Sequence, residues 1–245
     1  EIYNQAPDLL NSEGKLNEIK LVIWTTTPWT IPANEAISVN QKLDYVIAQS
    51  SDRSLIIIAN DLLAKVSESL GIIYHKKVLI KGSILDGIVY KHPLFEKRSP
   101  VVLGGDYITT ESGTGLVHTA PGHGVDDFNT GKKYKLPISC PVDAKGFLTK
   151  EAGKFEGLNV LKDANNVIIN DLINTGSLLK EIPYEHRYPY DWRTKKPTIF
   201  RATEQWFASV EGFRDKALSA IEDVIWLPES GKNRIDSMVR ERGDW

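Results

Sequence analysis

A chain of 245 residues that is 41% hydrophobic and 9% aromatic can bury a core, which excludes an intrinsically disordered protein. Its 30 Lys and Arg nearly balance 32 Asp and Glu, so the chain does not hold nucleic acid through bulk positive charge, and any RNA contact must be local. No run approaches the roughly 18 apolar residues of a membrane helix. The single cysteine, Cys140, excludes an internal disulfide and fits a reducing cytosol.

The first half of the chain is predicted to be rich in β-structure. Short apolar runs alternate with Asn, Asp, Ser and Gly, which is the rhythm of a sheet or a barrel. One helix interrupts them, with Asn60 as its predicted cap and Gly71 as its stop. The predicted strands are residues 19–24, 36–39, 45–48, 54–59, 77–80, 87–90, 101–103 and 116–119.

The second half is predicted to be helical. Apolar residues repeat at helical spacing over residues 161–174, where Gly176 closes the helix, and again over residues 206–221 and 235–239. The whole chain is therefore expected to be a β-rich α+β protein, in which a small closed β-barrel is decorated with helices.

The stretch at residues 184–197 combines aromatic, basic and proline residues: Tyr-Glu-His-Arg-Tyr-Pro-Tyr-Asp-Trp-Arg-Thr-Lys-Lys-Pro. Interleaved aromatic and cationic side chains can stack on the bases of RNA and pair with its phosphates. The same composition is equally typical of a proline-fixed linker whose aromatic side chains pack locally. The sequence leaves both interpretations open.

Two further stretches contain residues with chemical potential, and the first is residues 24–34. A predicted buried strand ends there at Trp24 and is followed by three consecutive threonines, residues 25–27. Pro28 biases the residue before it away from helical backbone angles, so the segment would present hydroxyls and free backbone N–H groups at a sheet edge. An ordinary exit from a strand, with threonine present for its β propensity, explains the same residues equally well.

The second stretch, residues 113–128, places glycines around a short predicted strand that ends at His118. As a metal site, His118, His123, Asp126 and Asp127 would supply ligands, but the Pro and Gly between them exclude the helical spacing of a zincin. As a nucleophilic site, a threonine activated by His118 would lack the Gly-x-Ser-x-Gly elbow. As a recognition site, a carboxylate would pair with an ammonium. The plainest interpretation makes Asp126 a helix cap and His118 a hydrogen-bonded core histidine.

These two stretches together carry a family resemblance. The segments Trp-Thr-Thr-Thr-Pro-Trp-Thr-Ile-Pro-Ala-Asn (24–34) and Gly-Thr-Gly-Leu-Val-His-Thr-Ala-Pro-Gly-His-Gly-Val-Asp-Asp (113–127) resemble the connective-peptide editing domain of isoleucyl-tRNA synthetases. Valyl and leucyl enzymes share this insertion but typically have Thr-Thr-Arg-Pro in the first segment, so Pro28-Trp29-Thr30 favours the isoleucyl branch. The resemblance continues at residues 186–193, 200–207 and 237–245.

The resemblance implies one part of a larger enzyme. Neither ATP-binding motif of class I synthetases occurs in the chain, so no cofactor or metal is expected in it, and the ATP, magnesium and zinc sites are expected outside it. Residues 1–185 would form the editing barrel domain, and residues 186–245 the return segment toward the absent catalytic core. The missing initial Met and the abrupt end at Trp245 agree with an excised domain.

The implied activity is the removal of a wrongly attached amino acid. Valine lacks one methylene of isoleucine, which a pocket discriminates only about 10–200-fold, and isoleucyl-tRNA synthetase is itself a well-known example of this limit. A second site therefore hydrolyses mischarged Val-tRNA(Ile). The expected partners are the 3′ end of that tRNA, valyl-adenylate and the remainder of the synthetase, with a cytoplasmic location, no membrane and a monomeric state.

The resemblance assigns the two charged or titratable positions. Asp127 would pair with the α-ammonium of the substrate, a contact that every aminoacyl ester offers. His118 would limit the side-chain pocket so that the extra methylene of isoleucine clashes. His123 matches the family segment but receives no role beyond packing or a turn hydrogen bond.

The remaining positions come from the first stretch. Thr26 and Thr27, with Thr25 nearby, would contact the terminal ribose, the ester and an attacking water, and Trp24 would wall the pocket. No covalent enzyme intermediate is expected, because the free ribose hydroxyl of the terminal adenosine would help to place the water. Proximity and orientation would then supply most of the rate.

Two alternative functions stay open at this point. The chain could be a module that binds the tRNA acceptor end without hydrolysing it in isolation. It could also be a metal-dependent hydrolase that uses the His/Asp cluster, in which case a chelator would abolish activity and zinc would restore it.

Overall fold

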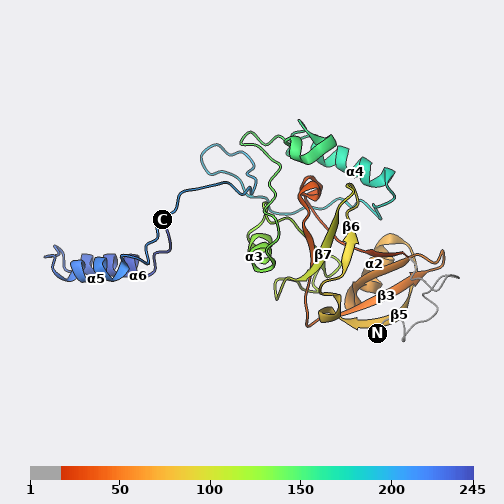
Figure 1. Ribbon diagram of the computed structural model, residues 1–245, viewed down its shortest axis with the longest axis horizontal. Helices are drawn as coiled ribbons and strands as arrows, with labels where there is room; N and C mark the ends of the chain where they lie inside the picture. Colours follow the sequence, from red (N-terminus) through yellow and green to blue (C-terminus); the bar gives the residue numbers. More distant parts are fainter. Residues whose placement is uncertain (1–17) are drawn as a thin grey trace. The chain divides into compact units, whose positions relative to one another are not determined.

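The computed structural model describes residues 18–245, which divide into two compact units, one ending at Ala202 and the other beginning at Thr203 (Figure 1). The second unit contains α5 (Arg214–Glu222) and α6 (Ser230–Arg240), which pack against each other. No helix among these residues is long and apolar enough to cross a membrane. The predicted boundary at residue 185 divides the editing domain from the return segment by function, whereas the two compact units are divided by packing. The boundary therefore stays a prediction.

The strands of the first unit form two four-stranded sheets. In the first sheet, β4 and β3 are central and antiparallel, while β1 joins β4 in parallel and β5 joins β3. In the second sheet, β2 lies between a parallel β7 and an antiparallel β8, and β6 is at the far edge. The strands are β1 (Ile19–Leu21), β2 (Ala36–Val39), β3 (Asp44–Ser50), β4 (Leu55–Ala59), β5 (Tyr74–Lys81), β6 (Val89–Lys91), β7 (Arg98–Leu103) and β8 (Leu116–Thr119).

The mixed α+β class is confirmed, but the prediction of a closed barrel is wrong. Across residues 18–245, β1 and β5 remain edges of one sheet and β6 and β8 remain edges of the other, whereas a barrel would pair every edge. Short strands separated by turns are equally compatible with open and closed sheets. Closure depends on which distant edges pair, and the local pattern does not carry that information.

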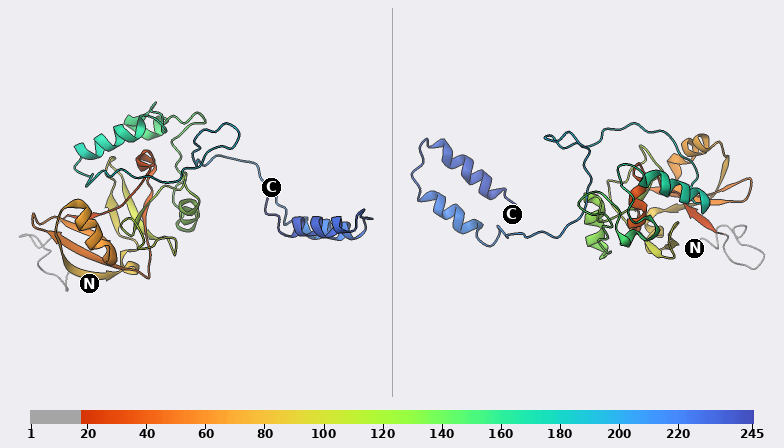
Figure 2. Two further views of the ribbon diagram at one scale, coloured as in Figure 1. Left: turned by 180° about the vertical axis from the view of Figure 1, so that it is seen from behind. Right: turned by 90° about the horizontal axis from the view of Figure 1, so that it is seen from above.

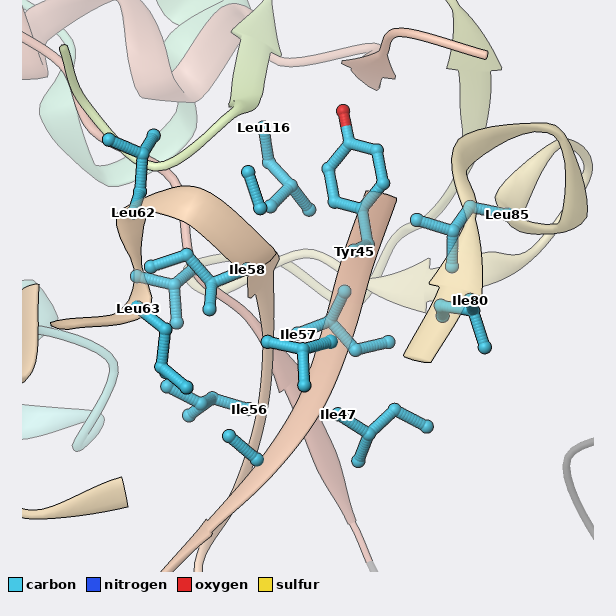
Figure 3. Packing of buried hydrophobic residues seen from close by; sticks show 14 of the residues in the cluster. Tyr45, Ile47, Ile56, Ile57, Ile58, Leu62, Leu63, Ile80, Leu85 and Leu116 are labelled. Atoms are coloured by element: carbon cyan, nitrogen blue, oxygen red, sulfur yellow. The ribbon is translucent and has the colours of Figure 1, made fainter. Parts of the chain in front are cut away.

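The larger core lies on the first sheet. Every residue of β4 is buried, which explains its uninterrupted apolar run, and α2 (Leu63–Leu70) follows it through a short turn at Asn60–Leu62. Figure 3 shows Tyr45 rising from β3 among these aliphatic side chains, with its hydroxyl at the end of the cluster near Leu116. That hydroxyl donates to the carbonyl of Gly115 at 2.7 Å, and burial raises the pKa of Tyr45 to about 12. The contact ties the first sheet to the start of β8.

Gly115 is required by its backbone and its surroundings. Its φ of +77° is a left-handed value, and a Cβ there would lie 2.4 Å from the Cβ of Ala59. The amide of Ala59 donates to the carbonyl of Thr114 at 2.9 Å, and this hydrogen bond keeps the end of β4 close to the residues before β8. The glycines before β8 therefore let this strand enter at a close crossing with the first sheet, and they fix its position.

A second core holds the segment that follows the threonines. The short helical turn η2 (Pro28–Ala33) buries Trp29 and Ile31 against η5 (Lys150–Phe155) and α4 (Ala164–Asn174). The amide of Trp29 donates to the side-chain oxygen of Asn165 at 3.0 Å, and α4 lies beside η2 in every view (Figure 1 and Figure 2). The three consecutive threonines, residues 25–27, are named the threonine segment, and η2 anchors this segment from its C-terminal side.

Helix boundaries were predicted with mixed success. The glycine stops are confirmed: Gly71 directly follows α2 with a φ of +70°, and Gly176 follows α4 after Thr175 with a φ of +66°. The prediction that Asn60 caps a helix with its side chain is wrong. No side-chain cap bond exists there, and the Asn60 side-chain oxygen instead accepts from the Lys76 ammonium at 2.7 Å.

Candidate functional site

His118 lies on β8 opposite Ile37 of β2 and is only 9% exposed. Both ring nitrogens have partners: Nδ1 lies 2.7 Å from the Asn34 amide nitrogen, and Nε2 lies 3.0 Å from the Thr30 hydroxyl. Burial lowers the pKa of His118 to about 3, so the ring is neutral near pH 7. This position confirms a buried, hydrogen-bonded histidine, and its ring is not an imidazolium at neutral pH.

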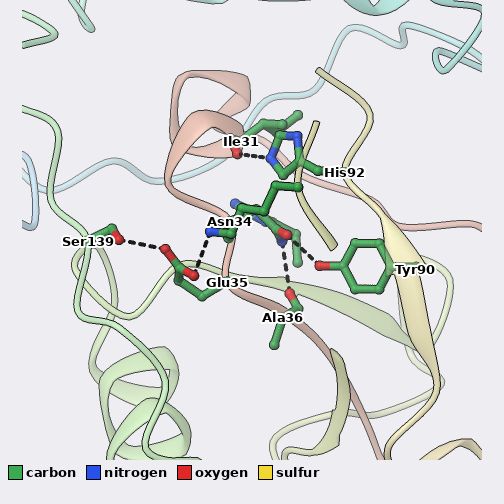
Figure 4. A network of polar contacts seen from close by, with 9 residues as sticks. Ile31, Asn34, Glu35, Ala36, Tyr90, His92 and Ser139 are labelled. Atoms are coloured by element: carbon green, nitrogen blue, oxygen red, sulfur yellow. Dashed lines mark hydrogen bonds and ion pairs between the residues drawn. The ribbon is translucent and has the colours of Figure 1, made fainter. Parts of the chain in front are cut away.

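The side chain of Asn34 fixes the tautomer of that ring. Its amide nitrogen also donates to the carbonyl of Ala36 at 2.8 Å, and its oxygen accepts from the hydroxyl of Tyr90 (Figure 4). Because Asn34 presents N–H to His118, Nδ1 must accept, and the proton must reside on Nε2. Nε2 then donates to Thr30.

The Thr30 hydroxyl connects this histidine to the threonine segment. It accepts from His118 and donates to the carbonyl of Thr27 at 2.8 Å, while the Thr30 amide donates to the same carbonyl at 3.0 Å. Hydrogen bonds therefore run in one direction from Tyr90 through Asn34 and His118 to Thr27. A buried polar network thus joins the two stretches at residues 24–34 and 113–128.

The three threonines are half-buried and unequal. The hydroxyl of Thr25 accepts from the Thr27 amide at 3.1 Å and lies 3.5 Å from the Thr27 hydroxyl, so these two side chains stabilise the turn. Thr26 makes no hydrogen bond to any part of the chain that the structure describes.

Asp127 lies in the first turn of α3 (Val125–Tyr134), just after β8. Its Oδ2 accepts from the Ala120 amide at 2.8 Å, two residues beyond His118, and its other oxygen has no hydrogen bond within residues 18–245. Burial raises the pKa of this carboxyl to about 6, and the charge of Asp126 adds to the shift. The suggested cap role of Asp126 is wrong, because Gly124 precedes the helix and no side chain caps it.

The raised pKa of Asp127 predicts a pH-dependent cost in stability. The pKa of an unfolded Asp is about 4, so ionised Asp127 destabilises the fold above about pH 6 and has no such effect below about pH 4. We expect Asp127→Asn, which keeps an acceptor for Ala120, to be more stable at pH 7.5 by on the order of 1–3 kcal/mol. Thermal melting at pH 7.5 and pH 4.5 checks this: the gain should shrink at the lower pH, and an equal gain at both would contradict it.

Trp24 precedes the three threonines in the chain, and His123 contacts Trp29 of η2. Trp24 is 38% exposed, lies so near Gly113 that a Cβ on that glycine would be 3.3 Å from the indole, and contacts Tyr184 edge-on at 5.0 Å. The Nδ1 of His123 donates to the carbonyl of Phe200 at 2.9 Å, and its ring meets Trp29 edge-on at 5.0 Å. His123 therefore holds the chain near residue 200 against η2.

Sequence reasoning missed the residues that connect the site. Thr30 and Asn34 lie inside the first stretch, but their partners are 88 and 84 residues away in the chain. Their only local signal is that each is a polar residue in a mainly buried, apolar segment: Thr30 lies within η2 and Asn34 lies directly after it. Between residues 18 and 245, no three His, Cys, Asp or Glu side chains gather closely enough to hold a metal ion.

A family model described as tRNA synthetases class I (I, L, M and V) matches residues 9–245, and the chain belongs to this family. It is 90% identical over all 245 residues to the isoleucine–tRNA ligase of Prochlorococcus marinus strain NATL1A. It is 65% identical over 227 residues, 93% of the chain, to that of Synechococcus sp. strain CC9311. The resemblance to isoleucyl-tRNA synthetases is confirmed, and the chain spans about a quarter of the length of these curated relatives.

Two solved structures from leucyl-tRNA synthetases have a similar fold. The structure described as GlLeuRS-CP1 matches with a TM-score of 0.58 at 17% identity, over 75% of this chain and 91% of that one. The editing domain of the Plasmodium knowlesi (P. knowlesi) cytosolic leucyl-tRNA synthetase matches with a TM-score of 0.54 at 15% identity, over 71% and 88% of the two chains. At such identities the likeness establishes the fold alone, which is the mixed α+β fold of a CP1 editing domain.

Proposed function

We propose that the chain is the editing site of an isoleucine-specific synthetase and hydrolyses the valyl ester of Val-tRNA(Ile). The proposal extends to valyl-adenylate, which carries the same amino acid on an activated carbonyl. Its partners would be the 3′ end of that tRNA and the remainder of the synthetase, in the cytoplasm. The observation that carries the proposal is the buried network that joins the threonine segment to His118, with the Asp127 carboxylate hydrogen-bonded to the Ala120 amide, two residues beyond His118.

Asp127 would orient the substrate through its α-ammonium. One oxygen is held by the Ala120 amide and the other has no hydrogen bond to residues 18–245, so the free oxygen can accept from a cation. A partly buried carboxylate with a raised pKa gains more from an arriving ammonium than a solvated one, because its charge has lost water. This contact positions any aminoacyl group and does not select among them.

His118 would act as a wall rather than as a base. Its Nδ1 accepts from Asn34 and its Nε2 donates to Thr30, so neither nitrogen can take a proton from water or from a threonine. The depressed pKa disfavours the imidazolium as well. These contacts fix the ring in place, which suits a rigid limit on the size of the amino-acid side chain and argues against a nucleophilic threonine activated by His118.

Water would attack the ester carbonyl, and no covalent intermediate would form on the protein. The hydroxyl and amide of Thr26, which have no partner in the described part of the chain, would hold the ester or the water. Thr25 and Thr27 would keep the turn in shape through their mutual hydrogen bond. The rate would then come mainly from orientation of the ester, the ribose hydroxyl and the water.

Deacylation of Val-tRNA(Ile) by the 245-residue chain tests this function. We expect release of valine faster than spontaneous hydrolysis, and we expect the same rate after treatment with a chelator because the proposed step uses no metal. Binding of the tRNA without release of valine would instead favour a module that only holds the acceptor end. Loss of activity with chelator and recovery with zinc would contradict the metal-free mechanism.

A further inference from the structure

A row of aromatic rings leads away from Trp24. Tyr184, His186, Tyr188 and Tyr190 contact one another in series, with ring centroids 5.6, 6.0 and 6.3 Å apart, and Tyr184 contacts Trp24 at 5.0 Å. These five residues are named the aromatic ladder. Its first member, Trp24, lies three residues after the end of β1 and directly before Thr25, so the ladder is continuous with the candidate site.

The sequence explains how the ladder forms. Its four later members occupy every second position of a segment without helix or regular strand, which begins after Pro183 and includes Pro189. In an extended chain, alternate side chains point to the same side, and proline favours such extended backbone. Six residues of extended chain span about 20 Å. The rings therefore line one side of a long, narrow track.

The ladder is open to solvent. Tyr184 and Tyr190 are 57% and 61% exposed, and the nearby Trp192 is 71% exposed with the guanidinium of Arg193 4.7 Å from its ring. A row of large exposed aromatic side chains is unusual on a surface that has no partner. Two of the four ring contacts are nearly perpendicular, at 85°, which leaves ring faces uncovered for a flat ligand.

The surrounding charge is positive although the chain as a whole carries −2. Residues 184–201 contain five Lys and Arg against two acidic residues, and the carboxylate of Asp191 is occupied by the Thr194 amide at 2.6 Å. Aromatic faces that alternate with cations are the combination that single-stranded nucleic acid binds, through base stacking and phosphate pairing. This segment therefore has the local positive charge that an RNA contact would need in a chain of net negative charge.

We propose that the aromatic ladder binds the unpaired nucleotides that precede the terminal adenosine of tRNA, with their bases stacked on its exposed rings. The bound strand would run along residues 184–190 toward Trp24 and deliver the ester to the threonine segment. This inference rests on the proposed function for its choice of ligand. It adds a binding track outside the site where the ester would react.

Binding of an uncharged RNA oligonucleotide ending in CCA tests the ladder. We expect the double variant Tyr184→Leu/Tyr190→Leu to bind a fluorescent oligonucleotide about tenfold or more weakly than wild type, because stacking on each ring is lost. The double variant Tyr184→Phe/Tyr190→Phe keeps both rings and should bind like wild type. Tyr190→Leu alone should lose part of the affinity. Equal binding by all variants, or no measurable binding by wild type, would overturn the inference.

A second readout separates failure of the ladder from failure of the proposed function. Valyl-adenosine lacks the preceding nucleotides, whereas a valylated CCA oligonucleotide has them. We expect the Leu double variant to hydrolyse valyl-adenosine at the wild-type rate and the valylated oligonucleotide at least several-fold more slowly at limiting concentration. If wild type hydrolyses neither ester yet binds the oligonucleotide through the ladder, the proposed function fails alone. If both esters are hydrolysed at wild-type rates by the variant, the ladder fails alone.

Discussion

Replacing Asp127 by Asn is expected to slow deacylation of Val-tRNA(Ile) by about a hundredfold or more. The variant keeps the acceptor for the Ala120 amide but removes the negative charge that would hold the α-ammonium. Truncating one partner of a buried charge pair costs about 2–5 kcal/mol, which corresponds to this loss. Single-turnover deacylation of purified Val-tRNA(Ile) at pH 7.5 measures it.

Asp126 supplies a matched control for that variant. It is the adjacent carboxylate in the same helical turn, but it is exposed. Asp126→Asn should therefore deacylate at close to the wild-type rate, whereas Asp127→Asn should not. Similar losses in both variants would indicate a general effect of charge, and unchanged hydrolysis in Asp127→Asn would remove the ammonium role.

Replacing His118 by Ala is expected to let the chain hydrolyse Ile-tRNA(Ile). Removing the imidazole opens the volume in which the extra methylene of isoleucine would clash, and one methylene is worth about 1–3 kcal/mol of discrimination. We expect the rate on the isoleucyl ester to rise at least tenfold while the valyl ester is still hydrolysed. Parallel deacylation of the two esters by the same preparation measures the change in their ratio.

The loss of His118 also carries a structural cost that the experiment must separate. Asn34 and Thr30 each lose a buried hydrogen-bond partner, at about 1–3 kcal/mol for each group left unpaired. His118→Asn is a second variant that reduces the volume but keeps a polar side chain, and His75→Ala removes an exposed histidine elsewhere. Continued sparing of Ile-tRNA(Ile) by folded Ala and Asn variants would remove the size-limiting role of His118.

The sequence predicts local structure well where one residue decides it. Gly71 and Gly176 end helices because left-handed backbone angles suit glycine, and the strand 116–119 is confirmed with the same ends. Asn60 fails as a cap because its side chain is used by Lys76, which is a contact between distant segments. The closed barrel fails for the same kind of reason, since strand edges pair or stay open according to distant parts of the chain.

The candidate site could be predicted in its members but not in its connections. The resemblance points to His118 and Asp127. The structure adds that the neutral His118 ring, hydrogen-bonded at both nitrogens, lies in the same network as Thr27. The spacing of residues in the sequence predicts neither the tautomer of His118 nor the raised pKa of Asp127. Both follow from burial and from partners in other parts of the chain. The roles proposed for these side chains therefore depend on the fold as much as on the motif.

A structure of the chain bound to a non-hydrolysable amide analogue of valyl-adenosine tests the proposed ester-binding site directly. We expect the α-ammonium to lie within hydrogen-bond distance of the Asp127 carboxylate, the valine side chain to face the His118 ring, and the ribose or the ester position to contact Thr26. An analogue that binds away from these three residues, or one that leaves Asp127 without a cation, would contradict the proposal that the threonine segment, His118 and Asp127 form one ester-binding site.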